Sequence, residues 1–306
     1  MSEVLPPALA RELAEHLSPA SMVRCDEPLG RRTTLRVGGT ADLYVEPGSE
    51  SDLARVLQFC SQRRLPCFVL GRGSNLLVKD SGFRGVVICL ARPALNFITV
   101  NGDRVQCGAG AKLKAVAYEA RRCSLAGLEF LEGIPGSVGG ALRMNAGAMG
   151  GAIFDRVESV RLMDLQGQAR EVLPSDMQVG YRSCLLLKDY VAVSAVLRGE
   201  PGVAAEIERR MNEFSQKRWS SQPAAPSAGC MFKNPAGIPA GRLIDELGLK
   251  GTRIGGAMVS VEHANFLVND GSATARDVLD LIEFIRCRAR TERGIELERE
   301  VEVVGE

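Results

Sequence analysis

The chain contains few of the residues from which metal centres and disulfide frameworks are built. Its 306 residues include two histidines, His16 and His263, and nine cysteines among which no C-x-x-C pair occurs. An odd and widely spread set of cysteines is typical of reduced thiols rather than of a disulfide framework or a zinc site. No catalytic set of serine, histidine and aspartate is evident. The sequence therefore predicts reduced thiols and no metal site.

Charge of one sign and long apolar runs are also missing. Thirty-eight basic residues face 37 acidic residues, which leaves a net charge of +1 and no overall field for nucleic acid or an acidic membrane. No apolar run reaches the roughly 18 residues of a membrane span, and the first residues, MSEVLPPALARELAEHL, lack the apolar stretch of a signal peptide. We therefore expect a cytoplasmic protein that binds neither membrane nor nucleic acid.

The two common nucleotide fingerprints, G-x-G-x-x-G and G-x-x-x-x-G-K-[ST], do not describe the most glycine-rich stretch of the chain. This stretch is LEFLEGIPGSVGGALRMNAGAMGG, residues 128–151. A loop with so few Cβ atoms lets backbone N–H groups converge on one anion, which favours a cradle for a diphosphate. The alternative is a glycine-rich turn that packs against a neighbouring backbone. Composition alone leaves both interpretations open.

A second loop has similar character. The strand expected at PCFVLG leads into Gly71–Leu76, with the sequence GRGSNL, which is rich in hydrogen-bond donors. A plain turn between strands is the simpler interpretation. Two donor-rich loops on one chain, however, suit a long cofactor with two phosphates better than either loop does alone. We therefore expect a second backbone cradle here.

The pattern of elements predicts two or three domains of α+β type, because the chain exceeds the usual domain length of roughly 100–150 residues. Helical spacing is expected at residues 7–17, 49–64, 111–124, 204–218, 241–247 and 274–293. Extended segments are expected at residues 31–37, 41–47, 66–71, 86–90, 158–165, 169–173, 190–197, 257–261, 264–269 and 297–304, with a hairpin at 95–105. Strands of mixed or antiparallel type make a pure doubly wound sheet unfavourable.

Three separated motifs contain residues that can carry chemistry. They are GYRS at 180–183, SAGCMFKNP at 227–235 and LEREVEV at 297–303. The fork of Arg182 suits a carboxylate or phosphate, although a surface arginine is the more common case. Cys230 would by itself be read as inert packing. The third motif places Glu298, Glu300 and Glu302 on one face of the expected strand, where a solvated acidic face is the usual explanation.

Together and in this order, the motifs have a specific likeness. The chain resembles the UDP-N-acetylenolpyruvoylglucosamine reductase family through TTLRVGGTADLYVEP, LGRGSNLLV, FLEGIPGSVGGALRMNAGA, GYRS, SAGCMFKNPAG, LIDELGLKG, GGAMVSVEHANFLVN and GIELEREV. The resemblance covers nearly the whole chain and indicates the compact type of the family, without an extra substrate-closing loop. It implies two FAD-binding subdomains of the vanillyl-alcohol-oxidase/PCMH type at residues 1–92 and 93–203. An α+β domain for the UDP-sugar would follow at residues 204–306.

The resemblance also implies the reaction. NADPH would reduce non-covalently bound FAD, and the flavin would reduce the enolpyruvyl ether of UDP-N-acetylglucosamine-enolpyruvate to UDP-N-acetylmuramate, a peptidoglycan precursor. Arg182 would polarise the substrate carboxylate, with Glu300 beside it as a protonated or hydrogen-bonding partner. Cys230 would give a proton to C2. The family usually has serine there, but a thiol, with an ordinary pKa of about 8.5, is protonated at neutral pH and is the stronger acid.

The family motifs assign the remaining site residues. Substrate contacts are expected at Tyr181, Lys233, Asn234 and His263. Contacts to FAD are expected at Gly71, Arg72, Gly73, Ser74, Asn75, Leu76, Gly133, Ile134, Pro135, Gly136, Ser137, Gly139, Gly140 and Asn145. A monomer is expected. Two departures from the family pattern are Arg32, where asparagine is frequent, and Ser221, where lysine is common; the second leaves the phosphate contacts of NADPH or UDP open.

Two other interpretations compete with this one. A different FAD oxidoreductase, acting on an alcohol or hydroxy acid, would share the glycine loops but not the GYRS, SAGCMFKNP and EREV motifs. A non-catalytic nucleotide-binding protein would purify colourless, or yellow and unresponsive to nicotinamides. Flavin that bleaches with NADPH and recovers with the enolpyruvyl sugar nucleotide would separate all three.

Overall fold

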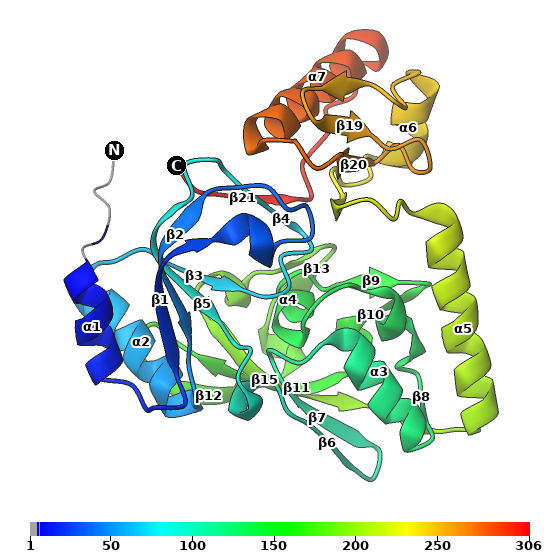
Figure 1. The fold of residues 1–306 in the computed structure, drawn as a ribbon. Coiled ribbons are helices and arrows are strands. Elements are labelled where there is room, and N and C mark those ends of the chain that lie inside the picture. Colours follow the sequence, from blue (N-terminus) through cyan, green and yellow to red (C-terminus); the bar gives the residue numbers. More distant parts are fainter. Residues whose placement is uncertain (1–4, 6) are drawn as a thin grey trace.

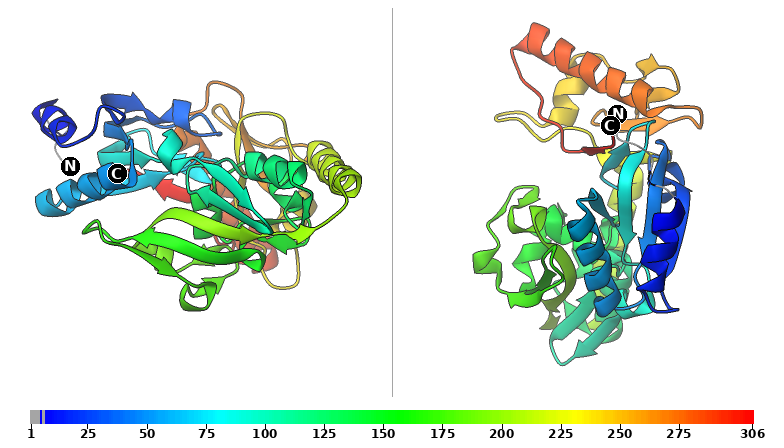
Figure 2. Two further views of the ribbon diagram at one scale, coloured as in Figure 1. Left: turned by 90° about the horizontal axis from the view of Figure 1, so that it is seen from below. Right: turned by 90° about the vertical axis from the view of Figure 1, so that its left-hand side faces the viewer.

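The computed structural model describes residue 5 and residues 7–306, and its strands form three main sheets (Figure 1). Two sheets from the first two thirds of the chain lie side by side. The third sheet and its helices stack at one end of the molecule, as Figure 1 and the right-hand view of Figure 2 show. The chain reaches this end through α5 (Ala204–Ser221), which runs along the side of the molecule.

The first sheet is mixed and has the order β1-β2-β5-β3. Its β1–β2 pair is antiparallel, whereas β5 lies parallel to both β2 and β3. Ser49 begins α2 because its side chain accepts a hydrogen bond from the Asp52 N–H. The strands and helices of this sheet are β1 (Met22–Pro28), β2 (Thr40–Glu46), β3 (Cys67–Leu70), β5 (Phe83–Cys89), α1 (Pro7–Glu15) and α2 (Glu50–Arg63).

The second sheet is antiparallel throughout, in the order β12-β11-β15-β7-β6. The expected hairpin is confirmed: Asn101 pairs with Arg104 across a turn at Gly102. The elements are β6 (Ile98–Asn101), β7 (Arg104–Gly108), β11 (Val157–Met163), β12 (Ala169–Val172), β15 (Val191–Arg198), α3 (Leu113–Arg122) and α4 (Val138–Arg143). Short paired strands beside it are β8 (Leu125–Ala126), β16 (Glu200–Pro201), β9 (Gly147–Ala148), β10 (Gly151–Ala152), β13 (Val179–Gly180) and β14 (Ser183–Cys184).

The third sheet is also antiparallel and has the order β17-β20-β19-β18. Its elements are β17 (Ser227–Cys230), β18 (Arg253–Ile254), β19 (Ala257–Val259), β20 (Phe266–Asn269), α6 (Ala240–Glu246) and α7 (Ala275–Arg293). One-turn helices complete the fold at η1 (Leu29–Arg32), η2 (Pro93–Leu95), η3 (Glu129–Gly133), η4 (Ile153–Asp155), η5 (Pro174–Asp176) and η6 (Leu186–Lys188). The antiparallel sheets confirm that the chain is not a pure doubly wound fold.

Hydrophobic packing divides the molecule differently from the sheets. One core cluster joins buried residues of the first two sheets, from Leu13 to Met211. A second core fills the C-terminal unit, but it also includes Leu35, Val37 and Leu77 from the N-terminal part. The C-terminal unit is therefore seated on apolar side chains that the first 92 residues supply.

Polar contacts fix the C-terminal unit to the rest. The strand β21 (Glu302–Val304) leaves this unit and pairs in parallel with β4 (Leu76–Val78). Asn269 donates from Nδ2 to the Leu35 carbonyl at 3.0 Å. The Asp80 carboxylate accepts from the N–H groups of Ala275 and Arg276, at 2.8 and 2.9 Å, and so caps the first turn of α7.

Two expected strands are wrong, and several observed strands were not expected, among them β1, β4 and β17. Residues 31–37 form the end of η1 and an irregular loop, while β1 lies upstream of them. Of residues 297–304, only Glu302–Val304 form a strand, so Glu298, Glu300 and Glu302 do not share a strand face. The segment changes partners along its length: the Lys233 N–H donates to the Glu298 carbonyl, whereas Glu302 donates to Asn75. A segment that passes from one unit to another in this way does not keep the alternating side-chain pattern of a regular strand.

Within residue 5 and residues 7–306, no helix is both long enough and apolar enough to cross a bilayer.

We expect Asp80→Ala to lower the free energy of unfolding by about 1–2 kcal/mol, because it removes both capping contacts at α7. Urea unfolding followed by circular dichroism would measure this loss. The matched control is Asp280→Ala, which removes an exposed ion pair with Arg276 from the same helix and should cost less than about 0.5 kcal/mol. Equal effects of the two substitutions would contradict a role for Asp80 in joining the units.

Candidate active site

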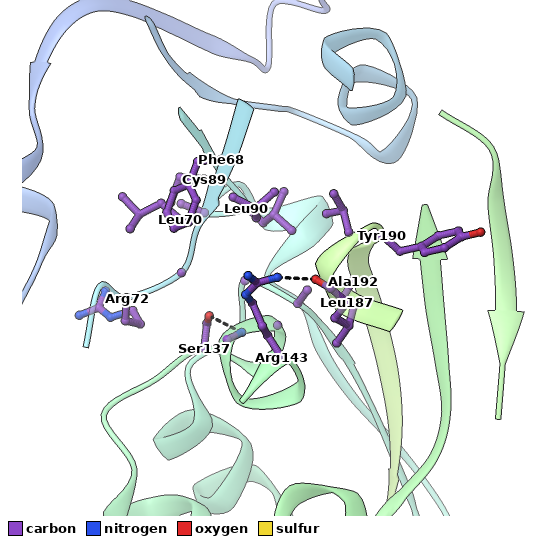
Figure 3. Close-up of a pocket in the computed structure, with 18 of the residues that line it drawn as sticks. Phe68, Leu70, Arg72, Cys89, Leu90, Ser137, Arg143, Leu187, Tyr190 and Ala192 are labelled. Atoms are coloured by element: carbon purple, nitrogen blue, oxygen red, sulfur yellow. Dashed lines mark hydrogen bonds between the residues drawn. The ribbon is translucent and has the colours of Figure 1, made fainter. Parts of the chain in front are cut away.

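A cavity of about 500 Å³ lies between the first two sheets, and both predicted cradle loops border it (Figure 3). Gly71 and Arg72 of the first loop and Ser137, Gly139 and Gly140 of the second loop line its wall. The rest of the wall is largely apolar and includes Phe68, Leu70, Cys89, Leu90, Leu187 and Val191. The cavity therefore combines a polar, glycine-rich side with an apolar side.

The two loops approach each other closely. A Cβ atom on Gly71 would lie 2.6 Å from the Ser137 Oγ, and one on Gly73, where φ is +61°, would lie 2.6 Å from the Arg32 carbonyl oxygen. Within the described part of the chain, the N–H groups of residues 72–75 donate no hydrogen bond. Ser137 begins α4, where its Oγ accepts from the Gly140 N–H. The first loop thus presents a run of free donors.

The other residues expected at the cofactor lie around these loops rather than on the cavity wall. Gly136 lies near the Ser74 side chain, since a Cβ on Gly136 would be 4.0 Å from the Ser74 Oγ. Leu76 begins β4 and is buried in an apolar cluster, so only its backbone is available to a ligand. Of the residues that the structure describes, the wall includes none of Gly73, Ser74, Asn75, Gly133, Ile134, Pro135 and Gly136.

Asn145 has an unsatisfied polar atom. Its backbone has a φ of +39°, and its Nδ2 donates to the Gly180 carbonyl at 3.1 Å. Its Oδ1 is buried and has no partner among the described residues. A buried acceptor without a donor is costly in free energy, which makes this atom a natural acceptor for a ligand N–H.

Arg182 and Glu300 form an ion pair although 118 residues separate them. The Arg182 Nε donates to the Glu300 Oε1 at 2.8 Å, and its Nη2 donates to the Gly147 carbonyl at 3.5 Å. Arg182 has a φ of +52° in the tight turn between β13 and β14. A left-handed conformation at a non-glycine residue is unfavourable, so tertiary contacts hold this arginine in place.

Backbone contacts position Glu300 on two sides. Its N–H donates to the Met231 carbonyl at 2.8 Å, and its carbonyl accepts from the Asn75 Nδ2 at 3.0 Å. Burial raises the pKa of the Glu300 carboxyl, and the charges of Arg182 and Lys233 oppose this rise. The pocket therefore favours a proton on Glu300 more than water does.

Cys230 ends β17 beside this ion pair. Burial, followed by the negative charge of Glu300, raises the pKa of its thiol to about 12, while Arg182 and a hydrogen bond with Asn265 act in the opposite direction. A Cβ on the preceding Gly229 would lie 3.7 Å from the Ser74 carbonyl oxygen. The structure thus brings Arg182, Glu300 and Cys230 together next to the first glycine loop.

The sequence analysis did not identify Asn265, which hydrogen-bonds to Cys230 and to the Phe232 backbone. Its Oδ1 accepts from the Phe232 N–H at 3.0 Å, and its Nδ2 donates to the Phe232 carbonyl at 2.8 Å. Only 3% of this residue is exposed. The one available signal was an amide directly before the apolar residues FLV, in the motif AMVSVEHANFLVN.

The expected substrate residues divide into two groups. Tyr181 is 58% exposed beside Arg182. The Lys233 Nζ contacts Glu298, and its charge opposes the rise in the pKa of Glu300. Asn234 caps α6 through Ala240, and the His263 ring contacts Phe266. Within residues 7–306, no contact joins Asn234 or His263 to the Arg182–Glu300 pair.

Among the residues that the structure describes, no group of three or more histidine, cysteine, aspartate or glutamate side chains could hold a metal ion.

Comparisons with known proteins match the N-terminal and C-terminal parts of the chain separately. Residues 41–172 match a family model described as an FAD binding domain. Residues 222–304 match the C-terminal domain of UDP-N-acetylenolpyruvoylglucosamine reductase.

Whole-chain relatives extend this likeness. The UDP-N-acetylenolpyruvoylglucosamine reductase of Geobacter metallireducens is 46% identical over 92% of this chain and 93% of its own length. That of Clostridioides difficile is 43% identical over 93% and 94%. The crystal structure of the Thermus caldophilus enzyme superposes with a TM-score of 0.81 at 40% identity, over 93% of this chain and 99% of that one.

The chain belongs to the UDP-N-acetylenolpyruvoylglucosamine reductase family. The family resemblance is therefore confirmed. The match of residues 41–172 also confirms the expected α+β FAD-dependent oxidoreductase.

The residues present fit FAD. The free N–H groups of residues 72–75 and the closely approaching Ser137 suit a diphosphate, and the orphaned Asn145 Oδ1 suits a hydrogen bond from the flavin. The apolar wall from Phe68 to Leu90 offers space for uncharged rings.

We expect Gly73→Ala in this reductase to weaken FAD binding by at least about tenfold, because a side chain at positive φ would also press on the Arg32 carbonyl oxygen. Fluorescence titration of the FAD-depleted chain would measure the affinity. Gly102→Ala is the control, since Gly102 has a φ of +60° but no atom within 4 Å of the added Cβ. If Gly102→Ala weakened FAD equally, the close approach at residue 73 would be irrelevant.

We also expect the Cys230 thiol to react with iodoacetamide at pH 8 about a thousandfold more slowly than the exposed Cys287, because a pKa of about 12 leaves almost no thiolate. Peptide mass spectrometry at timed intervals would give both rates. Comparable rates would show that the pocket does not suppress ionisation of Cys230.

Proposed function

We propose that this chain reduces the enolpyruvyl ether of UDP-N-acetylglucosamine-enolpyruvate to UDP-N-acetylmuramate in peptidoglycan precursor synthesis, with Arg182, Glu300 and Cys230 as its catalytic residues. Bound FAD supplies the hydride chemistry, with NADPH as the reductant. The observation that carries this proposal is the convergence of a guanidinium, a carboxyl group and a buried thiol beside the glycine loop. These three groups match the charge and proton needs of this reduction.

Arg182 would bind the substrate carboxylate. Hydride addition to the terminal methylene leaves negative charge on C2, which spreads onto that carboxylate, so a cation must face it. The Arg182 Nε is already held by Glu300, and its terminal nitrogens retain donors for the substrate. Glu300 would orient the guanidinium and, when protonated as its raised pKa favours, would hydrogen-bond to the aci-carboxylate.

Cys230 would donate the proton that C2 requires. With a pKa of about 12, the thiol keeps its proton across the neutral range. It remains a stronger acid than the serine usual in the family, so the substitution preserves the role. The thiolate left behind would lie near Arg182, and it would regain a proton from solvent before the next cycle.

Contacts to the bound molecules follow from the same placement. The loop residues 71–76, residues 133–140 and Asn145 would hold FAD without a covalent bond, as their free donors and close approach support. Tyr181 and Lys233 would meet the substrate beside Arg182. Asn234 and His263 would bind farther along the sugar nucleotide.

The organisation of the chain is part of the proposal. We divide it into FAD-binding subdomains at residues 1–92 and 93–203 and a substrate domain at residues 204–306, as the membership of the three sheets supports. The enzyme would act as a monomer in the cytoplasm, where its nucleotide substrates are available. Gel filtration and cell fractionation would test these two points.

We expect Cys230→Ala to slow flavin reoxidation by the enolpyruvyl substrate by about 10²–10⁴-fold, the usual contribution of a general acid, and to leave flavin reduction by NADPH within about twofold. Stopped-flow absorbance measures the two half-reactions separately. In the unmodified enzyme, this thiol should cause no fall in the reoxidation rate between about pH 6 and pH 9, because its pKa of about 12 lies above that range.

Cys230→Ser is the matched control, and it should retain reoxidation within about tenfold since it restores a hydroxyl donor. Unchanged reoxidation in Cys230→Ala would remove the thiol from the mechanism. Flavin that responds to neither NADPH nor the enolpyruvyl substrate would contradict the proposed reaction as a whole.

A further inference from the structure

The cavity wall carries more positive charge than the expected cofactor residues explain. Four basic residues line it, Arg72, Lys112, Arg143 and Lys188, and Asp189 is the one acidic residue on the described wall. The glycine loops themselves offer neutral N–H dipoles, whereas a diphosphate carries two negative charges. A cation fixed next to the loops would therefore complete the site.

Arg143 is the basic residue that the fold positions most firmly. It is the last residue of α4, the helix that Ser137 begins. One terminal nitrogen donates to the Leu187 carbonyl, and Nη2 donates to the Glu302 Oε1 at 2.9 Å. Figure 3 shows its side chain rising from α4 into the cavity, with the guanidinium between Ser137 and Leu187 in this view.

The anchor of Arg143 is itself tied to the first glycine loop. The Glu302 N–H donates to the Asn75 carbonyl at 3.1 Å, and the Asn75 Nδ2 contacts the sulfur of Met144, the residue after Arg143, at 3.7 Å. The guanidinium is thus linked through Glu302 to Asn75, the last residue of the run of free N–H groups at residues 72–75. Gly71 and Arg72 of this loop line the same cavity as Arg143.

We propose that Arg143 binds the diphosphate of FAD and that Glu302 is the positioning residue for its guanidinium. The inference rests on the FAD contacts proposed above for the glycine loops. A guanidinium has five N–H donors, and the contacts to Leu187 and Glu302 use two of them, which leaves three for phosphate oxygens. In a P-loop, a lysine within the loop binds the phosphates. Here an arginine that follows the second glycine loop would bind them instead.

Stability alone does not account for the Arg143–Glu302 pair. Its two side chains are 37% and 36% exposed, and ion pairs of such exposure contribute little to folding. Glu302 lies two residues after Glu300, so the same contact links the cofactor phosphates to the segment that carries the catalytic carboxyl group. Cofactor binding would therefore also order this segment.

The test compares FAD with riboflavin, which has the same ring and no phosphate, in fluorescence titrations of the FAD-depleted full-length chain. We expect Arg143→Gln to weaken FAD by about 10–100-fold and riboflavin by less than about twofold. Arg143→Lys keeps the charge without the fork and should weaken FAD by about three- to tenfold. Glu302→Gln should show a loss of similar size to Arg143→Lys, again for FAD only.

The matched control is Arg161→Gln. Arg161 pairs with Glu50 at 2.7 Å, both side chains are 37% exposed, and Arg161 is not on the cavity wall, so FAD affinity should stay within about twofold. Equal weakening of FAD and riboflavin by Arg143→Gln, or no weakening of either, would overturn the inference. So would a lowered flavin reduction potential with an unchanged FAD-to-riboflavin ratio, because the guanidinium would then face the ring.

These outcomes are separable from a failure of the proposed function. If the parent enzyme turns over normally and the Arg143→Gln variant binds FAD as tightly as the parent does, only the role of Arg143 is contradicted. A parent chain that binds no FAD would instead contradict the reductase. If Arg143→Gln does not fold, Arg143→Lys still gives the FAD-to-riboflavin comparison.

Discussion

The site depends on the position of one short loop, residues 71–76, which lies between the second glycine loop and the Arg182–Glu300 pair. On one side this loop meets Ser137 of the second glycine loop, and on the other the Asn75 side chain donates to the Glu300 carbonyl at 3.0 Å. A ligand held by the loop is therefore held at a fixed distance from the Glu300 carboxyl group. Because hydride transfer requires close and oriented partners, this shared support is the main structural condition for activity.

The C-terminal segment supplies the second half of the same arrangement. It returns from the third sheet to pair with β4, and along the way Glu300 meets Arg182 and Glu302 meets Arg143. One short stretch, residues 300–304, thus contacts β4, Arg182 and Arg143. The seating of the C-terminal unit on Leu35, Val37 and Leu77, with Asp80 at the start of α7, keeps that stretch in register.

The electrostatics of the cluster follow from burial and from the ion pair together. Burial raises the pKa of both Glu300 and Cys230, and the Arg182 charge counters part of each rise. The carboxyl group is thereby shifted towards its protonated form, and the thiol keeps its proton. A buried cysteine is usually inert packing, but the burial that raises the pKa of this thiol also keeps its proton in place, which is what the proposed role of Cys230 requires.

Local sequence determined the hairpin at Gly102, both glycine loops and the helices other than α4, because periodicity, capping and turn chemistry act over a few residues. Local motifs singled out Arg182, Cys230 and Glu300 but favoured simpler explanations for each, and only the family motifs suggested a shared role. The strand expected at residues 297–304 failed because that segment divides its hydrogen bonds between two units. Only the tertiary structure decided that Glu300 meets Arg182 across 118 residues, that Asn265 braces Phe232 and that Arg143 enters the cofactor cavity, since such contacts arise from packing between distant segments and leave no local period in the sequence.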